Sequence, residues 1–126
     1  MSFDWLAFFT LAGEIIANPL VSPEASERTA ISRAYYAAFN LAANRLETKT
    51  PPEWKRSGKA SDHGELATFL QRFGKTKKAT VGVNLSRLYE YRCHADYDDD
   101  FPGSSSKFAT AAMNLAKSAI EYIPQM

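Results

Sequence analysis

Residues 22–47, SPEASERTAISRAYYAAFNLAANRLE, predict one long helix. Ser22 supplies a hydroxyl for the N-cap, Pro23 suits the first helical position, and Glu24 places an acid in the first turn. Apolar side chains then recur at helical spacing and form one wide arc: Ile31, Ala34, Tyr35, Ala38, Phe39, Leu41, Ala42 and Leu46. A helix with so wide an apolar face has to bury it against other helices, which favours a helical bundle.

Helical patterns continue on both sides of this segment, and no strand pattern occurs. Residues 4–17 have a broad apolar face that is expected to pack in the bundle, and Asn18-Pro19 ends it. Further helices are predicted at 61–73, where Asp62 and Glu65 have capping-box spacing, at about 80–96, and from the serines 104–106 to residue 123. The fold prediction is a single all-α domain over 1–126, an antiparallel bundle of four or five helices.

Composition narrows the classes of function. Fifteen Lys and Arg against 14 Asp and Glu leave a net charge of +1, too balanced for a surface that coats nucleic acid non-specifically. The single cysteine, Cys93, excludes an internal disulfide. Neither a signal peptide nor an apolar run of membrane-spanning length is present, so a cytoplasmic protein is expected. No metal-ligand cluster or glycine-rich phosphate loop points to a metal or another cofactor.

An arginine interrupts the apolar stripe of the fourth predicted helix. The stripe runs through Val81, Leu85, Leu88, Arg92 and Ala95. A buried guanidinium keeps its charge and needs an anion. Asp96, one turn further on, offers an intrahelical ion pair that Arg33 from the second helix would complete; a partner's carboxylate or a phosphate is the alternative.

Other polar residues are weaker candidates. Arg33, Tyr36, Asn40 and Asn44 form a stripe on the second helix, either a solvated face or a ridge that meets Arg92. His63 opens the third helix, where it has either a capping role or an anion-binding role. His94 falls on the solvent-type face of its helix. Trp54, in the basic loop 48–60, either contacts RNA or tucks back onto the bundle.

Two segments together resemble the HEPN domain family. They are Ser-Arg-Ala-Tyr-Tyr-Ala-Ala-Phe-Asn at 32–40 and Leu-Tyr-Glu-Tyr-Arg-Cys-His-Ala-Asp-Tyr at 88–97, and His63 is similar to a histidine often found in the family's small stand-alone branch. The resemblance implies a helical bundle that dimerises through the motif helices. It also implies a partnership with a nucleotidyltransferase, or a role in toxin–antitoxin and phage-defence systems.

Active members of that family cleave RNA without a metal, through a motif of an arginine followed after a short spacer by a histidine. Arg92 matches the arginine, but Tyr97 stands where the histidine is expected. A phenol with a pKa near 10 is a poor general base at neutral pH, although it can donate a proton. The candidate catalytic residues are therefore Arg92, Asp96 and Tyr97, and the candidate RNA-binding residues are Arg33, Tyr36, Asn40 and His63.

Three hypotheses of different classes follow. The first is a homodimer that binds RNA in its cleft and cleaves it as a metal-independent endoribonuclease. The second is a catalytically inactive HEPN-like module that pairs with a nucleotidyltransferase, an antitoxin or another protein. The third is a structural helical dimer in which Arg92 and Asp96 close the interface.

Overall fold

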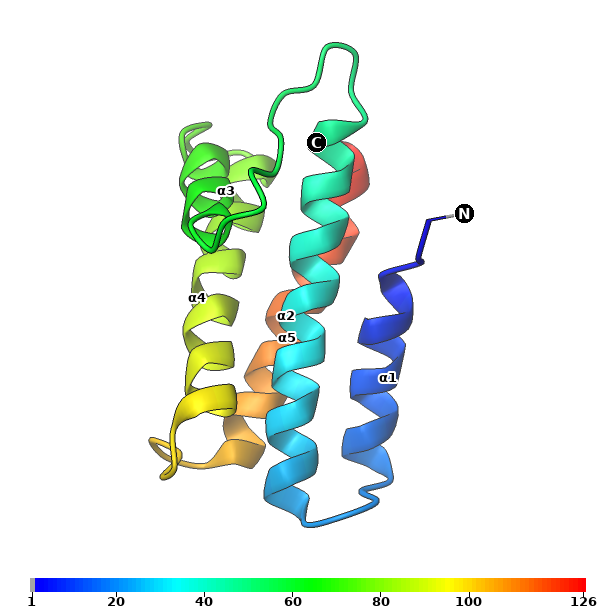
Figure 1. The fold of residues 1–126 in the computed structure, drawn as a ribbon, viewed down its shortest axis with the longest axis vertical. Helices are drawn as coiled ribbons and strands as arrows, with labels where there is room; N and C mark the ends of the chain where they lie inside the picture. Colours follow the sequence, from blue (N-terminus) through cyan, green and yellow to red (C-terminus); the bar gives the residue numbers. More distant parts are fainter. Residues whose placement is uncertain (1) are drawn as a thin grey trace.

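The computed structural model describes residues 2–126, and within them it contains five α-helices and a short terminal 3₁₀ turn. The helices are α1 (Leu6–Ala17), α2 (Pro23–Glu47), α3 (Asp62–Gln71), α4 (Lys77–Tyr97) and α5 (Ser105–Tyr122), and the turn η1 covers Ile123–Gln125. Figure 1 shows α1, α2, α4 and α5 running roughly along the long axis, with the shorter α3 beside the upper end of α4. The predicted all-α bundle is confirmed.

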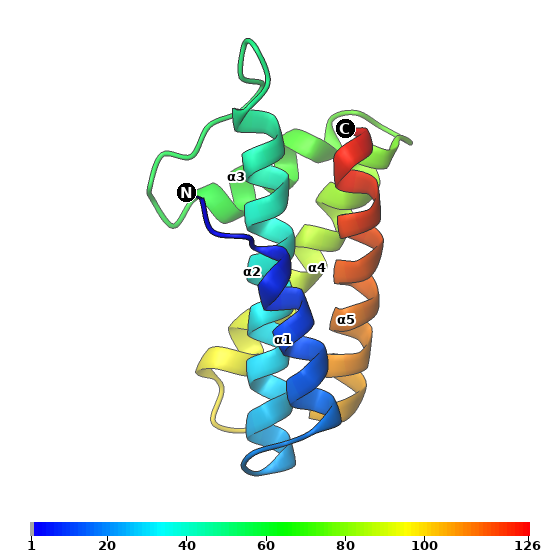
Figure 2. The ribbon, with the colours of Figure 1, turned by 90° about the vertical axis from the view of Figure 1, so that its right-hand side faces the viewer.

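The second helix lies at the centre of the bundle. It packs against α1, α4 and α5, while α4 packs in addition against α3 and α5. In the view turned by 90°, α1 crosses in front of α2, and α5 lies to one side of it (Figure 2). Neighbours on several sides explain why most side chains of its middle section, from Ala30 to Ala43, are buried.

Hydroxyl caps fix where three helices begin. Ser22, Thr76 and Ser104 each accept a hydrogen bond from the backbone N–H three residues on. The predicted bounds of the second helix are therefore confirmed. The fourth helix begins at Lys77, three residues before the expected start near 80, because the Thr76 cap already orders its first turn.

The predicted capping box of the third helix is wrong. Asp62 turns away from the helix and accepts hydrogen bonds of 3.0 and 3.1 Å from the Ser57 N–H, 2.6 Å from its hydroxyl and 3.0 Å from the Gly58 N–H. The Ser57 hydroxyl bond is the largest of the effects that lower the pKa of this carboxyl. Asp62 thus fastens the end of the 48–61 loop to the start of α3.

The first helix is less buried than its pattern predicts. Ala12 is its one fully buried residue, whereas Leu6 and Leu11 are about two-fifths exposed. The turn that follows exposes Leu20 and Val21 still more. The helix contacts the bundle mainly through α2 and only marginally through α5, so the other side of its broad apolar face stays open to solvent.

Between Ser2 and Met126, no helix combines the length and the apolar character that crossing a membrane requires.

Candidate functional site

Arg92 lies in the stripe of α4 that faces α2, and it is buried with 9% of its surface exposed. Its apolar stripe companions Val81, Leu85, Leu88 and Ala95 are buried as expected. The guanidinium donates from Nη2 to the Tyr36 hydroxyl at 2.7 Å and, more weakly, to the Tyr97 hydroxyl at 3.4 Å. The sequence prediction of a buried arginine in the core stripe is confirmed.

Three tyrosine rings surround the guanidinium. Its central carbon lies 5.3 Å from the ring centroids of Tyr36 and Tyr97 and 5.8 Å from that of Tyr89. Aromatic faces attract a cation, and the attraction is stronger where water is excluded. The ring faces therefore hold Arg92 in place in addition to the hydroxyl hydrogen bonds, and these ring contacts occupy none of its N–H groups.

The hydrogen-bonding capacity of Arg92 is only partly filled. Its Nε lies 3.1 Å from a carboxylate oxygen of Asp96, so the predicted intrahelical ion pair is confirmed. This ion pair is not a hydrogen bond, however, and Nε is buried without a hydrogen-bond partner. Nη1 contacts only the sulfur of Cys93, at 3.8 Å. Since Nη2 serves the two tyrosine hydroxyls and Nε faces Asp96, the N–H donors of Nη1 are those that remain for an anion.

The charge on Arg92 is secure at any ordinary pH. Burial, the largest single effect, lowers its pKa, but Tyr36, Cys93, Tyr97 and Asp96 together outweigh burial and raise the pKa above its usual range. The guanidinium of Arg92 is permanently charged, mostly buried and only partly hydrogen-bonded. These properties suit it to bind a phosphate or a carboxylate.

His63 joins the same cluster from the start of α3. Its ring stacks on Tyr89, with centroids 5.2 Å apart and planes 25° apart, and it hydrogen-bonds the Tyr35 hydroxyl through Nδ1. The local capping role is thus wrong, because the side chain points at α2 and α4. Burial, and next the charge of Arg92, lower the pKa of His63, so the imidazole is neutral at pH 7.

The partner of His63 decides which ring nitrogen carries the hydrogen. Tyr35 is 1% exposed, and burial raises the pKa of its hydroxyl far above the usual value. In residues 2–126 that hydroxyl meets no other acceptor, so it donates to Nδ1 of His63. The hydrogen of the neutral imidazole then belongs to Nε2, which makes His63 a hydrogen-bond donor rather than a base.

The predicted polar stripe of α2 divides among three neighbours. Only Tyr36 reaches Arg92. Asn40 and Asn44 accept hydrogen bonds of 2.9 and 3.1 Å from Arg56, which the 48–61 loop folds back over the upper part of the helix. The stripe is therefore neither a solvated face nor a continuous ridge against α4, and Asn40 lies outside the cluster.

Arg33 also lies outside the cluster. Its guanidinium sits 4.7 Å from the ring centroid of Phe8 on α1, and the ion pair expected with Asp96 is not among those formed by residues 2–126. Asp96 instead accepts a hydrogen bond of 3.2 Å from the Ser32 hydroxyl. The reason is rotation: one residue along a helix turns the side chain by about 100°, which takes position 33 to α1 and leaves position 32 beside α4.

The end of α4 is anchored beside the cluster. Arg28 of α2 donates to the carbonyls of Ala95, Asp98 and Asp99, which the helix end leaves without partners. His94 hydrogen-bonds Asp98 through Nδ1 at 2.6 Å, so it caps this turn and is not part of the Arg92 cluster. The anchored turn holds Tyr97 at the rim, where the ring is 71% exposed.

Sequence reasoning overlooked three residues at this site: Tyr89, which belongs to the cluster, and Tyr35 and Cys93, which contact its members. Tyr35 was assigned to the apolar arc, and its ring is buried there, but its hydroxyl orients His63. Tyr89 precedes Arg92 by three residues, a spacing that places both side chains on one helical face and could have indicated it. Cys93 follows Arg92 directly, and helical spacing gives no such signal for it. We refer to Tyr36, His63, Tyr89, Arg92, Asp96 and Tyr97 as the Arg92 cluster.

Comparison of the chain with protein-family models, curated proteins and solved structures finds no match in any of the three. Across residues 2–126, no three His, Cys, Asp or Glu side chains converge as a set that could hold a metal ion.

Proposed function

We propose that this chain binds single-stranded RNA at the Arg92 cluster and cleaves it without a metal ion, as the resemblance to the HEPN family implies. One observation carries the proposal: Nη1 of the Arg92 guanidinium, a side chain with 9% of its surface exposed, contacts only the weak acceptor sulfur of Cys93. A phosphodiester oxygen supplies the missing acceptors, and Tyr97 at the rim offers an exposed ring on which a base can stack.

The three residues nearest the phosphate divide the chemistry of cleavage. Arg92 binds the non-bridging oxygens and stabilises the charge that develops on them. The Asp96 carboxylate takes the proton of the ribose 2′-hydroxyl, and the 2′ oxygen attacks phosphorus. The bond from phosphorus to the 5′ oxygen breaks, and that oxygen takes the phenol proton of Tyr97. A 2′,3′-cyclic phosphate and a 5′-hydroxyl result, and proton exchange with water restores Asp96 and Tyr97.

His63 supports this chemistry as a neutral donor. The imidazole of His63 and the guanidinium of Arg92 both contact the ring of Tyr89. A neutral imidazole close to a permanent cation adds a hydrogen bond to a phosphate without adding charge repulsion. The proposal includes the homodimer, in which a second copy covers the exposed rim at Tyr97 and closes the cleft.

The test is incubation of labelled single-stranded RNA with the purified protein, in EDTA and without it. Arg92→Lys keeps the charge but loses the fork of donors, Asp96→Asn removes the base, and Tyr97→Phe removes the acid. Arg87→Lys and Tyr91→Phe on the same helix are matched controls, since Arg87 is exposed and Tyr91 packs on Phe108. Cutting in EDTA that the three variants lose and the controls keep supports the proposal. Cutting that Arg92→Lys retains in full refutes it.

A second function is favoured by the same ion pair. Asp96 already neutralises Arg92 within the chain, and Tyr97 is a large exposed ring of the kind that anchors protein interfaces. On this reading the cluster is a docking face for a nucleotidyltransferase, an antitoxin or another protein. This reading predicts that neither the parent protein nor its variants cleave RNA. It also predicts a complex with such a partner, which Tyr97→Ala weakens and Tyr91→Ala does not.

A further inference from the structure

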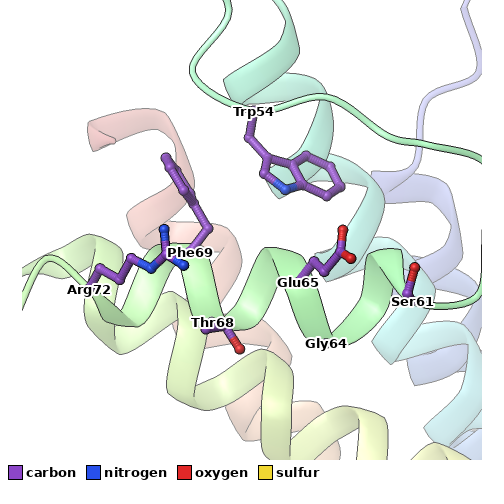
Figure 3. Close-up of a pocket in the computed structure, with 7 residues that line it drawn as sticks. All are labelled: Trp54, Ser61, Gly64, Glu65, Thr68, Phe69 and Arg72. Atoms are coloured by element: carbon purple, nitrogen blue, oxygen red, sulfur yellow. The ribbon is translucent and has the colours of Figure 1, made fainter.

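A groove of about 600 Å³ lies on the outer side of α3, and the proposed chemistry does not use it. Figure 3 shows Trp54 of the preceding loop above the helix, Phe69 and Arg72 toward one end, and the Glu65 side chain rising toward the indole. Trp54 is half-buried against the core, so the expectation that it tucks onto the bundle is confirmed, yet it also forms a wall of this groove.

One residue that lines the groove, Gly64, has no side chain. A Cβ built at Gly64 meets no atom within 4 Å outside its own helix turn, so the space above it is empty. Gly64 directly follows His63, whose ring points the other way, into the Arg92 cluster. The groove and the cluster therefore lie on adjoining sides of the first turn of α3.

Two opposite charges at the groove lack an ion-pair partner among the residues that the structure describes. Neither Glu65 nor Arg72 forms an ion pair with any residue between 2 and 126, although both line the groove. By contrast, the neighbouring cations Lys49, Arg56 and Lys78 are all paired with glutamates. A ligand that fits needs a flat ring for Trp54, an anion for Arg72 and hydrogen-bond donors for Glu65.

The surrounding charge selects an anionic ligand. Residues 49–78, which include the loop, α3 and the link to α4, contain eight Lys and Arg against three Asp and Glu. The rest of the chain contains seven against eleven, so the segment that carries the groove is the positively charged part of a nearly neutral chain. Such a segment attracts a phosphate backbone.

We propose that this groove is a subsite for one unpaired nucleotide of RNA. The base stacks on the Trp54 indole, its exocyclic amino group or the ribose hydroxyls donate to Glu65, and a flanking phosphate binds Arg72. The inference rests on the proposed function and extends it, because it gives the RNA a second point of attachment on α3 beside the cluster.

The test is titration of a short fluorescent single-stranded oligoribonucleotide into the full chain, followed by anisotropy. Gly64→Leu puts a side chain into the groove, and Arg72→Ala removes the phosphate contact. Both are expected to weaken binding about tenfold, the cost of one lost stacked or charged contact. Arg87→Ala, an exposed arginine away from the groove, is expected to bind as the parent does. Circular dichroism checks that each variant keeps its helical content.

Competition with AMP identifies the form of the ligand. Displacement of the oligonucleotide by AMP means that the groove accepts a free nucleotide, and absence of displacement, with both variants weakened, means that it accepts a nucleotide only within a chain. Unchanged affinity of Gly64→Leu overturns the inference. The two proposals fail separately: loss of binding in Gly64→Leu with no effect of Arg92→Lys on cleavage or binding refutes the Arg92 site alone, and the opposite pattern refutes the groove alone.

Discussion

The Tyr36 hydroxyl accepts a hydrogen bond of 2.7 Å from Nη2 of Arg92 and so joins α2 to α4 across 56 positions of the chain. The same tyrosine ring lies 5.3 Å from the guanidinium carbon, so Tyr36 both orients the cation and covers it. The contact with Tyr36 is a formed hydrogen bond, whereas the contact of Nε with Asp96 is an ion pair of 3.1 Å without one.

Tyr36→Phe is expected to destabilise the fold by about 1 to 2 kcal/mol, because a buried charged donor loses its acceptor while the ring is kept. Urea unfolding followed by circular dichroism measures the change. Tyr91→Phe is the control, since the ring of Tyr91 packs on Phe108 and its hydroxyl has no part in the cluster. Equal stability of the two variants would mean that the hydrogen bond contributes nothing.

Gly82 and Gly64 offer a matched pair of substitutions. A Cβ at Gly82 would lie 2.8 Å from the Ala67 carbonyl oxygen and 2.9 Å from Leu70 Cβ, since α3 and α4 touch there. Gly82→Ala is expected to cost about 1 to 3 kcal/mol of overpacking, which cancels or exceeds the roughly 1 kcal/mol that alanine returns as a better helix former.

Gly64→Ala is expected to stabilise by up to about 1 kcal/mol, because its Cβ meets open space in a helix. Thermal unfolding of both variants beside the parent provides the comparison. A stabilised Gly82→Ala protein would show that α3 and α4 pack less closely than described.

The lowered pKa of His63 makes the free energy of unfolding depend on pH. Its pKa in the folded state is lower than in the unfolded chain, mainly through burial, so the unfolded state binds the proton more readily. The stabilisation is complete above the unfolded value near 6.5 and is lost as the pH falls through the lower folded value. His63→Gln should flatten this acid limb of the stability profile. A parent profile without such a limb contradicts the burial of His63.

Asp62 is expected to keep the end of the 48–61 loop ordered. Asp62→Ala removes the acceptor of the Ser57 and Gly58 amides, and these amides should exchange with solvent much faster. Hydrogen exchange by NMR measures the change, and Asp99→Ala, in an exposed turn, serves as the control. Unaltered protection at Ser57 and Gly58 would mean that another contact holds the loop.

Sequence reasoning anticipated the helices well and the site unevenly. Helical periodicity and caps are local properties, so Ser22 and the stripe through Arg92 could be recognised from spacing alone. The placement of Arg33 against Phe8, of Asn40 against Arg56 and of His63 against Tyr35 depends on how helices rotate and how a long loop returns, which no local pattern encodes. The groove beside Trp54 could not be predicted from the sequence for the same reason.

The central claim is that Arg92 is an anion site for RNA and not only an internal ion pair. The most direct measurement is the affinity of the parent, Arg92→Lys and Arg87→Lys for a fluorescent single-stranded RNA at one fixed salt concentration. We predict about a tenfold loss for Arg92→Lys and no loss for Arg87→Lys, because a lysine cannot reproduce the bidentate fork. Equal affinity of all three proteins, with the fold intact, would contradict the account.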